Sequence, residues 1–321
     1  MRRTPWAFVI MNNMEPIYVA FAADENYAQH LGVAMMSLLH NIASDVSVNF
    51  TIIGDNLSAK STSRLKHIAS GNNLSIDFPV QDFQNFKDLT VNRHLTRATY
   101  ARLALPDIID VDKVLYLDSD IIVRADISKL WEIDISEYYS GSVLDTYVNG
   151  PYGQSRIDPR LGLAAGEDYF NAGVLLLNLK KCRQDNVMKK AISFKLQNPD
   201  STYHDQDGLN AAMHGRWLPL NPCWNVQTSA FRLCYNGKYR RNLPAETIEA
   251  VKNPAIVHFT SVAKPWHYGC YWPYVDEYYK YLAFTPWKDY QPTGWTLRGM
   301  LKKNRRLFKR RLKSAILGYR V

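Results

Sequence analysis

The stretch KVLYLDSDIIV, residues 113 to 123, places two aspartates, Asp118 and Asp120, between two apolar runs. A carboxylate that moves from water into an apolar interior without a partner loses several kcal/mol of hydration. Acids in such surroundings are therefore paired, protonated or bound to a cation. We expect two carboxylates inside a buried strand, with a partner that neutralises them.

A divalent cation is one such partner. Two carboxylates two residues apart at a strand end can converge on Mg²⁺ or Mn²⁺, which prefer oxygen ligands and keep positions open for water and phosphates. His258 ends another apolar strand, and its imidazole could supply a third ligand if the two strand ends are neighbours. Lys264 could reach a phosphate as a point charge. The alternatives are solvated acids in a turn, a core histidine and a surface lysine.

The first part of the chain alternates strands and helices. Apolar runs predict strands at 17–27, 48–53 and 74–78, with a helix after the first and another at 58–70. The first helix carries apolar residues at helical spacing, namely Leu31, Ala34, Met35, Leu38, Leu39 and Ile42. This order predicts a parallel sheet with crossover helices, whose ligands bind at the carboxyl ends of the strands. Asp24 and Asp118 both fall there.

The pattern loosens after residue 125. The stretch from 147 to 169 is rich in Gly and Pro, which is typical of a long surface loop. Order then returns with a predicted strand at 169–179, a helix that opens within 204–215 and a further strand at 255–260.

The composition is that of a globular protein. The chain has 321 residues, of which 46% are hydrophobic, enough for one large or two ordinary domains. Its four cysteines lie far apart without a C-x-x-C pair, which indicates reduced thiols in a cytosol-like compartment. No apolar run approaches the roughly 20 residues that a membrane-spanning helix needs. Residues 1–16 are expected to be a disordered leader, or an over-long start.

Positive charge is concentrated at the C-terminus. Residues 298–321 hold ten Lys or Arg and no acid, so the rest carries −1, the difference between the net +9 and +10. Because one segment accounts for the excess, the charge does not indicate nucleic-acid binding. The segment has an apolar stripe, made of Leu297, Leu301, Phe308, Leu312 and Ile316. It predicts a basic amphipathic helix on an anionic membrane surface. The alternatives are a helix packed on the body and a disordered basic tail.

Several common signatures are missing. The sequence has no G-x-x-x-x-G-K-[ST], G-x-G-x-x-G, H-E-x-x-H or G-x-S-x-G motif, so P-loop, dinucleotide, zinc-protease and hydrolase functions lose their main support. A metal site that faces a diphosphate remains the most direct interpretation of the paired acids.

Six stretches together resemble glycosyltransferase family 8. They are FAADENY, TYARLALPD, KVLYLDSDIIV, YFNAGVLLLNLKK, HDQDGLN and HFTSVAKPWH, in the order and spacing of that family over about residues 17 to 270. The likeness is greatest to bacterial lipo-oligosaccharide and lipopolysaccharide galactosyl- and glucosyltransferases. It implies a GT-A fold of the α/β class, with a mixed, mainly parallel sheet flanked by helices at 17–290. It also implies a membrane-associating tail at 291–321.

The resemblance also implies roles for single residues. Nucleotide and diphosphate contacts match Ala22, Asp24, Asn26, Tyr27, Arg102, Ser119, Ser261 and Lys264. The metal ligands match Asp118, Asp120 and His258. The residues around the donor sugar, which with Lys264 are the candidate catalytic group, match Asn171, Asp205 and Gln206. Acceptor-side positions match His94, Thr99, Asp145 and Tyr203. Ser261 departs from the family, which usually has glycine there, and a positive φ would strain serine.

The implied reaction is metal-dependent transfer of galactose or glucose from a UDP-sugar, with retention, to a glycan such as lipopolysaccharide at the inner face of the cell membrane. A double displacement needs a carboxylate nucleophile. Gln206 is a poor nucleophile and Asp205 equally suits sugar hydroxyls, so we favour same-face attack by the acceptor. Two alternatives are a metal-dependent nucleotidyltransferase or phosphohydrolase, and a catalytically silent glycan-binding module.

Overall fold

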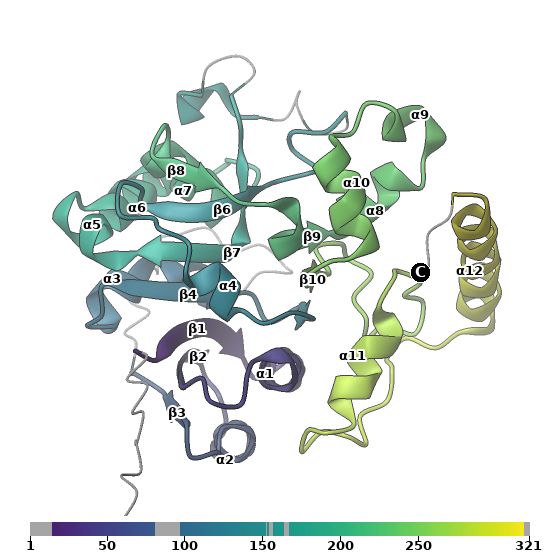
Figure 1. Ribbon diagram of the computed structural model, residues 1–321, viewed down its shortest axis with the longest axis horizontal. Helices are drawn as coiled ribbons and strands as arrows, with labels where there is room; N and C mark the ends of the chain where they lie inside the picture. Colours follow the sequence, from purple (N-terminus) through teal and green to yellow (C-terminus); the bar gives the residue numbers. More distant parts are fainter. Residues whose placement is uncertain (1–14, 81–96, 152, 154–156, 164–166, 318–321) are drawn as a thin grey trace, which may run out of the picture.

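The computed structural model describes residues 15–80, 97–151, 153, 157–163 and 167–317. Most of the predicted leader, and His94, lie outside these residues. A seven-stranded sheet runs through the centre of the molecule (Figure 1). Its strands, in spatial order, are β3 (Leu74–Asp77), β2 (Val48–Asp55), β1 (Ile17–Asp24), β4 (Lys113–Leu117), β7 (Phe170–Asn178), β6 (Ser140–Leu144) and β8 (Trp217–Pro219).

The strand directions confirm a mixed, mostly parallel sheet. β3, β2, β1 and β4 are parallel neighbours, as the strand and helix order of the first part predicts. β7 is antiparallel to both β4 and β6, and β8 is parallel to β6. The carboxyl ends of β1 and β4 therefore meet at one edge of the sheet, where Asp24 and Asp118 lie.

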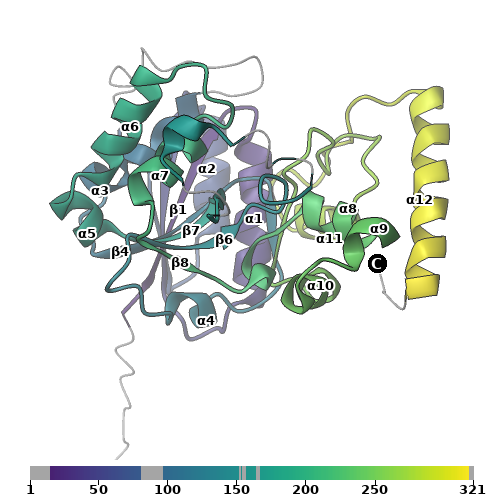
Figure 2. The ribbon, with the colours of Figure 1, turned by 90° about the horizontal axis from the view of Figure 1, so that it is seen from above.

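Helices cover both faces of this sheet (Figure 2). One face packs against α1 (Ala28–Asn41), α2 (Ala59–Ile68) and α4 (Ser128–Trp131). The other face packs against η2 (Arg97–Ala104), α3 (Leu105–Ile108), α5 (Leu179–Gln184), α6 (Val187–Gln197) and α7 (Asp205–Met213). The apolar stripe predicted for α1 faces the sheet, and its central residues Leu31, Ala34, Met35 and Leu38 are fully buried. The two faces thus form two hydrophobic cores.

A second, three-stranded sheet lies beside the first. It contains β5 (Ile121–Val123), β10 (Ile256–His258) and β9 (Val226–Gln227), in that order. A third core joins it to α1, α8 (Thr228–Cys234), α10 (Ala245–Lys252) and α11 (Val275–Leu282). Two short elements, η5 (Pro222–Asn225) and α9 (Gly237–Arg240), flank α8.

The stretch 113–123 is divided between the two sheets. Its first apolar run is β4 of the large sheet, and its second is β5 of the small one. The expectation of two carboxylates inside one buried strand is therefore wrong, because Asp118, Ser119 and Asp120 form the connection between the sheets. Both apolar runs are buried, but each pairs with strands of a different sheet. The two acids therefore lie at the junction of the sheets.

The middle of the chain holds structure that the sequence pattern did not reveal. β6 has the sequence SGSVL, and Ser140 and Ser142 are fully buried, with their hydroxyls 3.0 Å apart. Such a strand lacks the alternation of apolar and polar residues that predicts a strand. The predicted loop from 147 to 169 contains, in its described residues, only the short η4 (Pro159–Leu161).

The last helix, α12 (Leu297–Leu317), stands apart from the sheets and runs along the body (Figure 2). Its basic side faces the body: Lys303 lies over the ring of Tyr268 at 4.8 Å, and Arg306 lies over Tyr271 at 4.5 Å. Lys313 donates to the carbonyl of Tyr235 at 3.0 Å. The apolar side points outward and is more than half exposed at Leu297, Leu301, Phe308 and Leu312.

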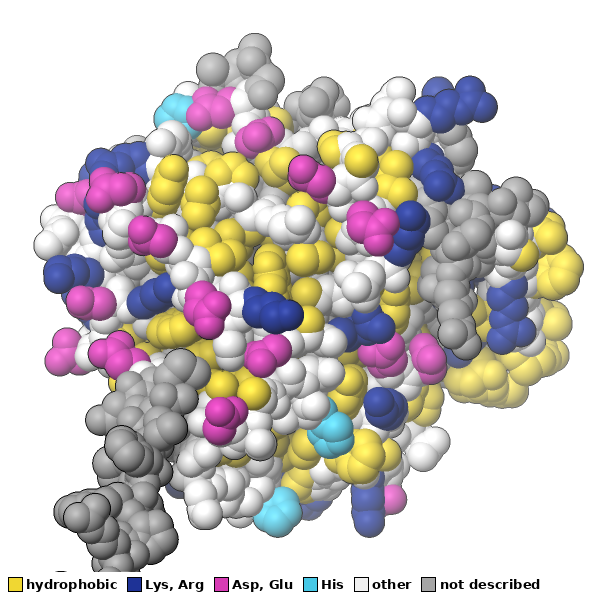
Figure 3. Space-filling model, in the orientation of Figure 1, with side chains coloured by type: hydrophobic (Ala, Val, Ile, Leu, Met, Phe, Trp, Pro, Cys, Tyr) yellow, Lys and Arg dark blue, Asp and Glu magenta, His cyan; other side chains and the backbone are white. Residues whose placement is uncertain are grey.

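Figure 3 shows hydrophobic side chains along the outer edge of the molecule where α12 lies, whereas charges of both signs are scattered over the rest of the visible face. The amphipathic pattern of α12 is therefore inverted relative to a helix that buries its apolar stripe in its own protein. None of the helices in the described residues combines the length and the apolar character needed to cross a membrane.

Candidate active site

Asp118, Asp120 and His258 come together where the two sheets join. β5 pairs antiparallel with β10, which places Ile121 opposite His258 and brings the imidazole to the acids. His258 Nε2 lies 3.2 Å from Asp120 Oδ1 and 3.6 Å from Asp118 Oδ2. One ligand atom from each residue lies within 4.8 Å of the others, so the three side chains could hold one metal ion.

Two cations neutralise the carboxylates from the protein itself. Arg102 Nη2 lies 2.8 Å from Asp118 Oδ1, and Lys264 Nζ lies 2.5 Å from Asp120 Oδ2. Tyr116 donates its hydroxyl to Asp118 Oδ1 at 3.0 Å. The acids are therefore paired, which is the condition that the cost of burying charge imposes.

The balance of burial and charge differs between the acids. Burial alone would raise the pKa of Asp120, but the charges of Lys264 and His258 outweigh it and hold that pKa well below its usual range. Burial raises the pKa of Asp205 to about 6, although Arg102 acts in the opposite direction. Asp120 is thus suited to bind a cation, while Asp205 is easily protonated.

Gly173 makes room for this group. A Cβ atom at residue 173 would lie 2.2 Å from His258 Cε1 and 2.6 Å from Asp118 Oδ2. The backbone of Gly173 also accepts a hydrogen bond from Asp118 N at 2.8 Å. β7 therefore passes directly behind the two ligand candidates, and only a residue without a side chain fits.

A cavity of about 650 Å³ opens beside this group, at the carboxyl ends of β1 and β4. Asp118 and Asp120 line it, together with every predicted nucleotide contact, namely Ala22, Asp24, Asn26, Tyr27, Arg102, Ser119, Ser261 and Lys264. Asp24 Oδ1 accepts from the backbone N–H of Tyr27 at 3.1 Å, and Ser119 Oγ donates to the carbonyl of Ala22 at 3.0 Å. These bonds hold the turn after β1 against the connection between the sheets.

The residues predicted around the donor sugar lie behind the cavity wall. Arg102 connects them to the acids, because its Nε lies 2.9 Å from Asp205 Oδ2 while its Nη2 reaches Asp118. Gln206 Oε1 accepts from the backbone N–H of Ala172 at 2.9 Å and from Asn171 Nδ2 at 3.2 Å. The structure thus brings these residues next to one another, without exposing them along the cavity.

Ser261 has no positive φ, so the backbone conformation does not require glycine at this position. Its hydroxyl accepts a hydrogen bond from Trp272 Nε1 at 2.7 Å and another from the backbone N–H of Ala263 at 3.2 Å. Serine therefore fixes an aromatic side chain beside the cavity, which glycine could not do.

The predicted acceptor-side residues are dispersed. Thr99 lines the cavity. Asp145 is buried and accepts from Asn171 Nδ2 at 3.0 Å and from Gln206 Nε2 at 3.1 Å. Tyr203 packs its ring 6.0 Å from that of Tyr169. His94 lies outside the described residues, so its place in the site stays a prediction.

Sequence reasoning missed Gly173, Tyr116 and Asn225. Asn225 is fully buried and its Oδ1 lies 3.0 Å from His258 Nδ1. Tyr116 is buried within β4 as an ordinary core residue would be. Gly173 and Tyr116 stand inside two of the six family stretches, and Asn225 stands in none of them; nothing in the chain singled out the three, because their roles depend on neighbours that are distant in the sequence.

Three comparisons place the chain among known proteins. The model of Glycosyl transferase family 8 matches residues 18–270. General stress protein A of Bacillus subtilis is 32% identical over 86% of this chain and 96% of its own length. The lipopolysaccharide 1,2-glucosyltransferase of Escherichia coli K12 is 29% identical over 89% of this chain and 84% of its own. The galactosyltransferase LgtC, solved with donor and acceptor sugar analogues, superposes with a TM-score of 0.74 at 30% identity, over 89% of this chain and 100% of its own.

Proposed function

Because this chain belongs to glycosyl transferase family 8 and has the GT-A fold, we propose that it transfers galactose or glucose from a UDP-sugar to a glycan hydroxyl with retention of the anomeric configuration. One observation carries the proposal. The Asp118, Asp120 and His258 group stands at the wall of a 650 Å³ cavity whose lining contains every residue expected to hold the nucleotide.

The donor set fits Mn²⁺ or Mg²⁺. Two carboxylates and one imidazole are ligands that Mn²⁺ accepts, and Gly173 leaves the space behind them free of a side chain. When bound, the ion would act as a Lewis acid that stabilises charge on the departing diphosphate. Lys264 faces the same cavity and can offer its ammonium group to a phosphate once it leaves Asp120.

The surroundings of the sugar-side residues favour same-face attack by the acceptor. Asp205 is buried against Arg102, and Gln206 is engaged by Ala172, Asn171 and Asp145. A covalent route needs a carboxylate beneath the anomeric carbon. Since neither residue lines the cavity, neither is presented as a nucleophile. Asp205 then acts on the donor through Arg102, which lines the cavity, and the phosphate oxygen that leaves takes the acceptor proton.

The acceptor in this proposal is a lipid-linked glycan, of which lipopolysaccharide is one example, at the inner face of the cell membrane. Two features support it: a relative that acts on lipopolysaccharide, and the outward apolar face of α12. A tethered enzyme meets a tethered substrate at a higher effective concentration.

UDP release from a panel of UDP-sugars tests the reaction. We expect one UDP-hexose to be turned over with Mn²⁺, with loss of turnover in EDTA and in the Asp120→Asn variant. Release of a monophosphate or pyrophosphate instead of UDP would indicate a nucleotidyltransferase or phosphohydrolase. If no UDP-sugar is bound or turned over with any metal, the transferase proposal is wrong.

A further inference from the structure

Asn225 connects His258 to the residues around the donor sugar. It lies at the end of η5, is fully buried and does not line the cavity. Its Oδ1 is 3.0 Å from His258 Nδ1, and its Nδ2 donates to Asn171 Oδ1 at 2.9 Å. The amide therefore spans the gap between β10 and β7.

Two neighbouring groups fix the orientation of the Asn171 amide, because one can only accept hydrogen bonds and the other can only donate. The carboxylate of Asp145 accepts hydrogen bonds, so the atom of Asn171 that faces it at 3.0 Å must be the donor Nδ2. The backbone N–H of Gly173 donates, so the atom that faces it at 3.1 Å must be the acceptor Oδ1. The same Oδ1 faces Asn225.

The orientation of Asn225 follows from that of Asn171. Since Asn171 presents an acceptor, Asn225 must present Nδ2 to it and Oδ1 to His258. A histidine nitrogen that faces a carbonyl oxygen carries the proton. Nδ1 of His258 thus carries a proton, and Nε2 is the nitrogen that faces Asp118 and Asp120, which lie 3.6 Å and 3.2 Å away.

We propose that Asn225 is a positioning residue that holds a proton on Nδ1 of His258 and so reserves Nε2 as the ligand atom for a metal ion. The part of this inference that concerns metal affinity rests on the proposed function. The assignment of the proton to Nδ1 of His258 does not. Outer partners of ligating histidines fix ring orientation, and their loss typically lowers metal affinity about 10- to 100-fold.

The test compares Asn225→Leu with Asn225→Asp. Leucine removes both hydrogen bonds, while aspartate keeps the acceptor for His258. We expect Mn²⁺ affinity, measured by electron paramagnetic resonance of the free ion, to fall about 10- to 100-fold in Asn225→Leu and less in Asn225→Asp. In the metal-free protein, ¹⁵N spectra of His258 should show a hydrogen-bonded, slowly exchanging Nδ1–H in the wild type and in Asn225→Asp, and this signal should be lost in Asn225→Leu.

The control is Asn221→Ala, which alters the other end of η5 without contact to His258. It should leave both readouts unchanged. If Asn225→Leu does not fold, Asn225→Ala, which also removes both hydrogen bonds, takes its place. Wild-type affinity and tautomer in both Asn225 variants would overturn the inference. If the wild type binds no Mn²⁺, the proposed function fails, while the tautomer measurement still tests Asn225.

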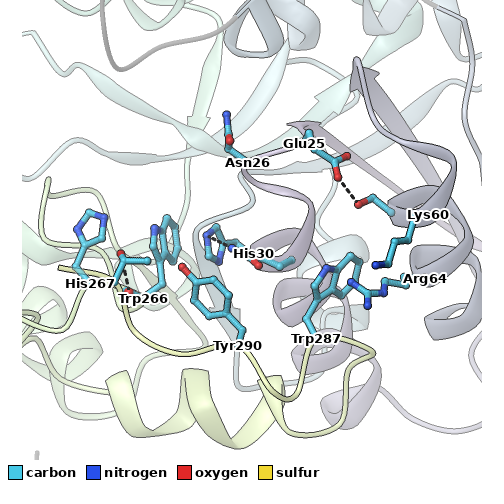
Figure 4. A pocket seen from close by; sticks show the side chains of 12 residues that line it. Glu25, Asn26, His30, Lys60, Arg64, Trp266, His267, Trp287 and Tyr290 are labelled. Atoms are coloured by element: carbon cyan, nitrogen blue, oxygen red, sulfur yellow. Dashed lines mark hydrogen bonds between the residues drawn. The ribbon is translucent and has the colours of Figure 1, made fainter. Parts of the chain in front are cut away.

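A second hollow adjoins the nucleoside end of the cavity (Figure 4). It has a volume of about 470 Å³ and shares Asn26, His30, Trp266 and His267 with the larger cavity. His30 and Trp266 form its inner wall, with their rings stacked 3.4 Å apart. None of the metal-ligand candidates lines this hollow.

The hollow is lined by charges of both signs. Glu25 accepts hydrogen bonds from Ser58 and Ser61 with both of its oxygens, and the charge of Arg64 also acts on its carboxylate. Lys60 and Arg64 stand one turn apart on α2, and Arg64 lies over the ring of Trp287 at 5.2 Å.

Discussion

Gly173 is the residue at which the geometry of the site is most tightly constrained. The Gly173→Ala variant would push a methyl group against His258 and Asp118. We expect the free energy of unfolding to fall by about 1–3 kcal/mol, because overpacked interiors shift their neighbours. Mn²⁺ affinity should fall about tenfold or more, since the ligands no longer converge. Urea unfolding and Mn²⁺ titration measure the two effects.

Gly269→Ala is the matched control, because a Cβ there meets nothing within 4 Å. It should change neither quantity. Wild-type Mn²⁺ affinity in Gly173→Ala would show that the space behind His258 is not needed for the site.

The raised pKa of Asp205 makes the free energy of unfolding depend on pH. Burial raises its pKa to about 6, so between about pH 4 and pH 6 the folded protein keeps a proton that the unfolded chain has lost. The stabilisation is complete below about pH 4 and is lost as the pH rises through 6. Relative to Asp205→Asn, the free energy of unfolding of the wild type should fall by at most about 3 kcal/mol from pH 4 to pH 7.

Urea unfolding of both proteins at each pH measures this difference. Asp77→Asn, at an exposed acid on β3, is the control and should follow the wild type. Parallel stability profiles for wild type and Asp205→Asn would contradict the assignment of a raised pKa.

The metal-ligand candidates could be predicted from the sequence, whereas the residues that make room for them and position them could not. Asp118, Asp120 and His258 are polar residues beside apolar strands, and this contrast is visible in the chain itself. Gly173 and Asn225 have no such contrast. Their importance comes from His258, which reaches both only after β10 has paired with β5.

At the scale of elements, α12 is the least ordinary part of the fold. Its cations lie on tyrosine rings and carbonyls of the body, and its apolar side is left exposed. The helix is therefore oriented before any partner arrives. The outward apolar side, together with the exposed Lys302, Arg305 and Lys309 of the same helix, fits the surface of an anionic bilayer better than water.

Replacing the outward residues tests this membrane proposal. In Leu301→Ser/Phe308→Ser/Leu312→Ser, binding to phosphatidylglycerol-containing vesicles should fall more than about tenfold, because apolar burial drives insertion. UDP release with a water-soluble acceptor should stay within about twofold, since α12 lies outside the cavity.

Vesicle co-sedimentation and UDP release measure the two properties. Lys302→Gln is the control for a single loss of exposed charge and should weaken vesicle binding only slightly. Undiminished vesicle binding by the triple variant would contradict a membrane role for this face.

The predictability of elements follows their hydrophobic pattern. β1, β2 and β3 were predicted at nearly their observed bounds, because apolar runs there alternate with an amphipathic helix. β6 was not, because its buried serines satisfy each other by a hydrogen bond. β9 has only two residues, too short for any periodicity. These strands exist because a neighbouring strand pairs with them, which is a property of the assembled sheet.

At the scale of the whole molecule, the cysteines form no disulfide with one another. All four cysteines are free, and three of them are buried. Burial raises the thiol pKa to about 12 at Cys182 and about 11 at Cys234. Native protein should therefore react with iodoacetamide at Cys223 at most, whereas urea-unfolded protein reacts at all four, as mass spectrometry would record. Rapid native labelling of Cys182 would contradict this packing.

The division of residues 113–123 between two sheets has a consequence for biosynthesis. β1, β2 and β4 can pair soon after they emerge from the ribosome, since their partners are all made early. β5 must wait for β10, which is translated near the end of the chain. Until then Asp120 lacks both His258 and Lys264. A nascent chain that has not yet made β10 therefore lacks the third ligand candidate and the lysine that neutralises Asp120, even where β1, β2 and β4 have already paired.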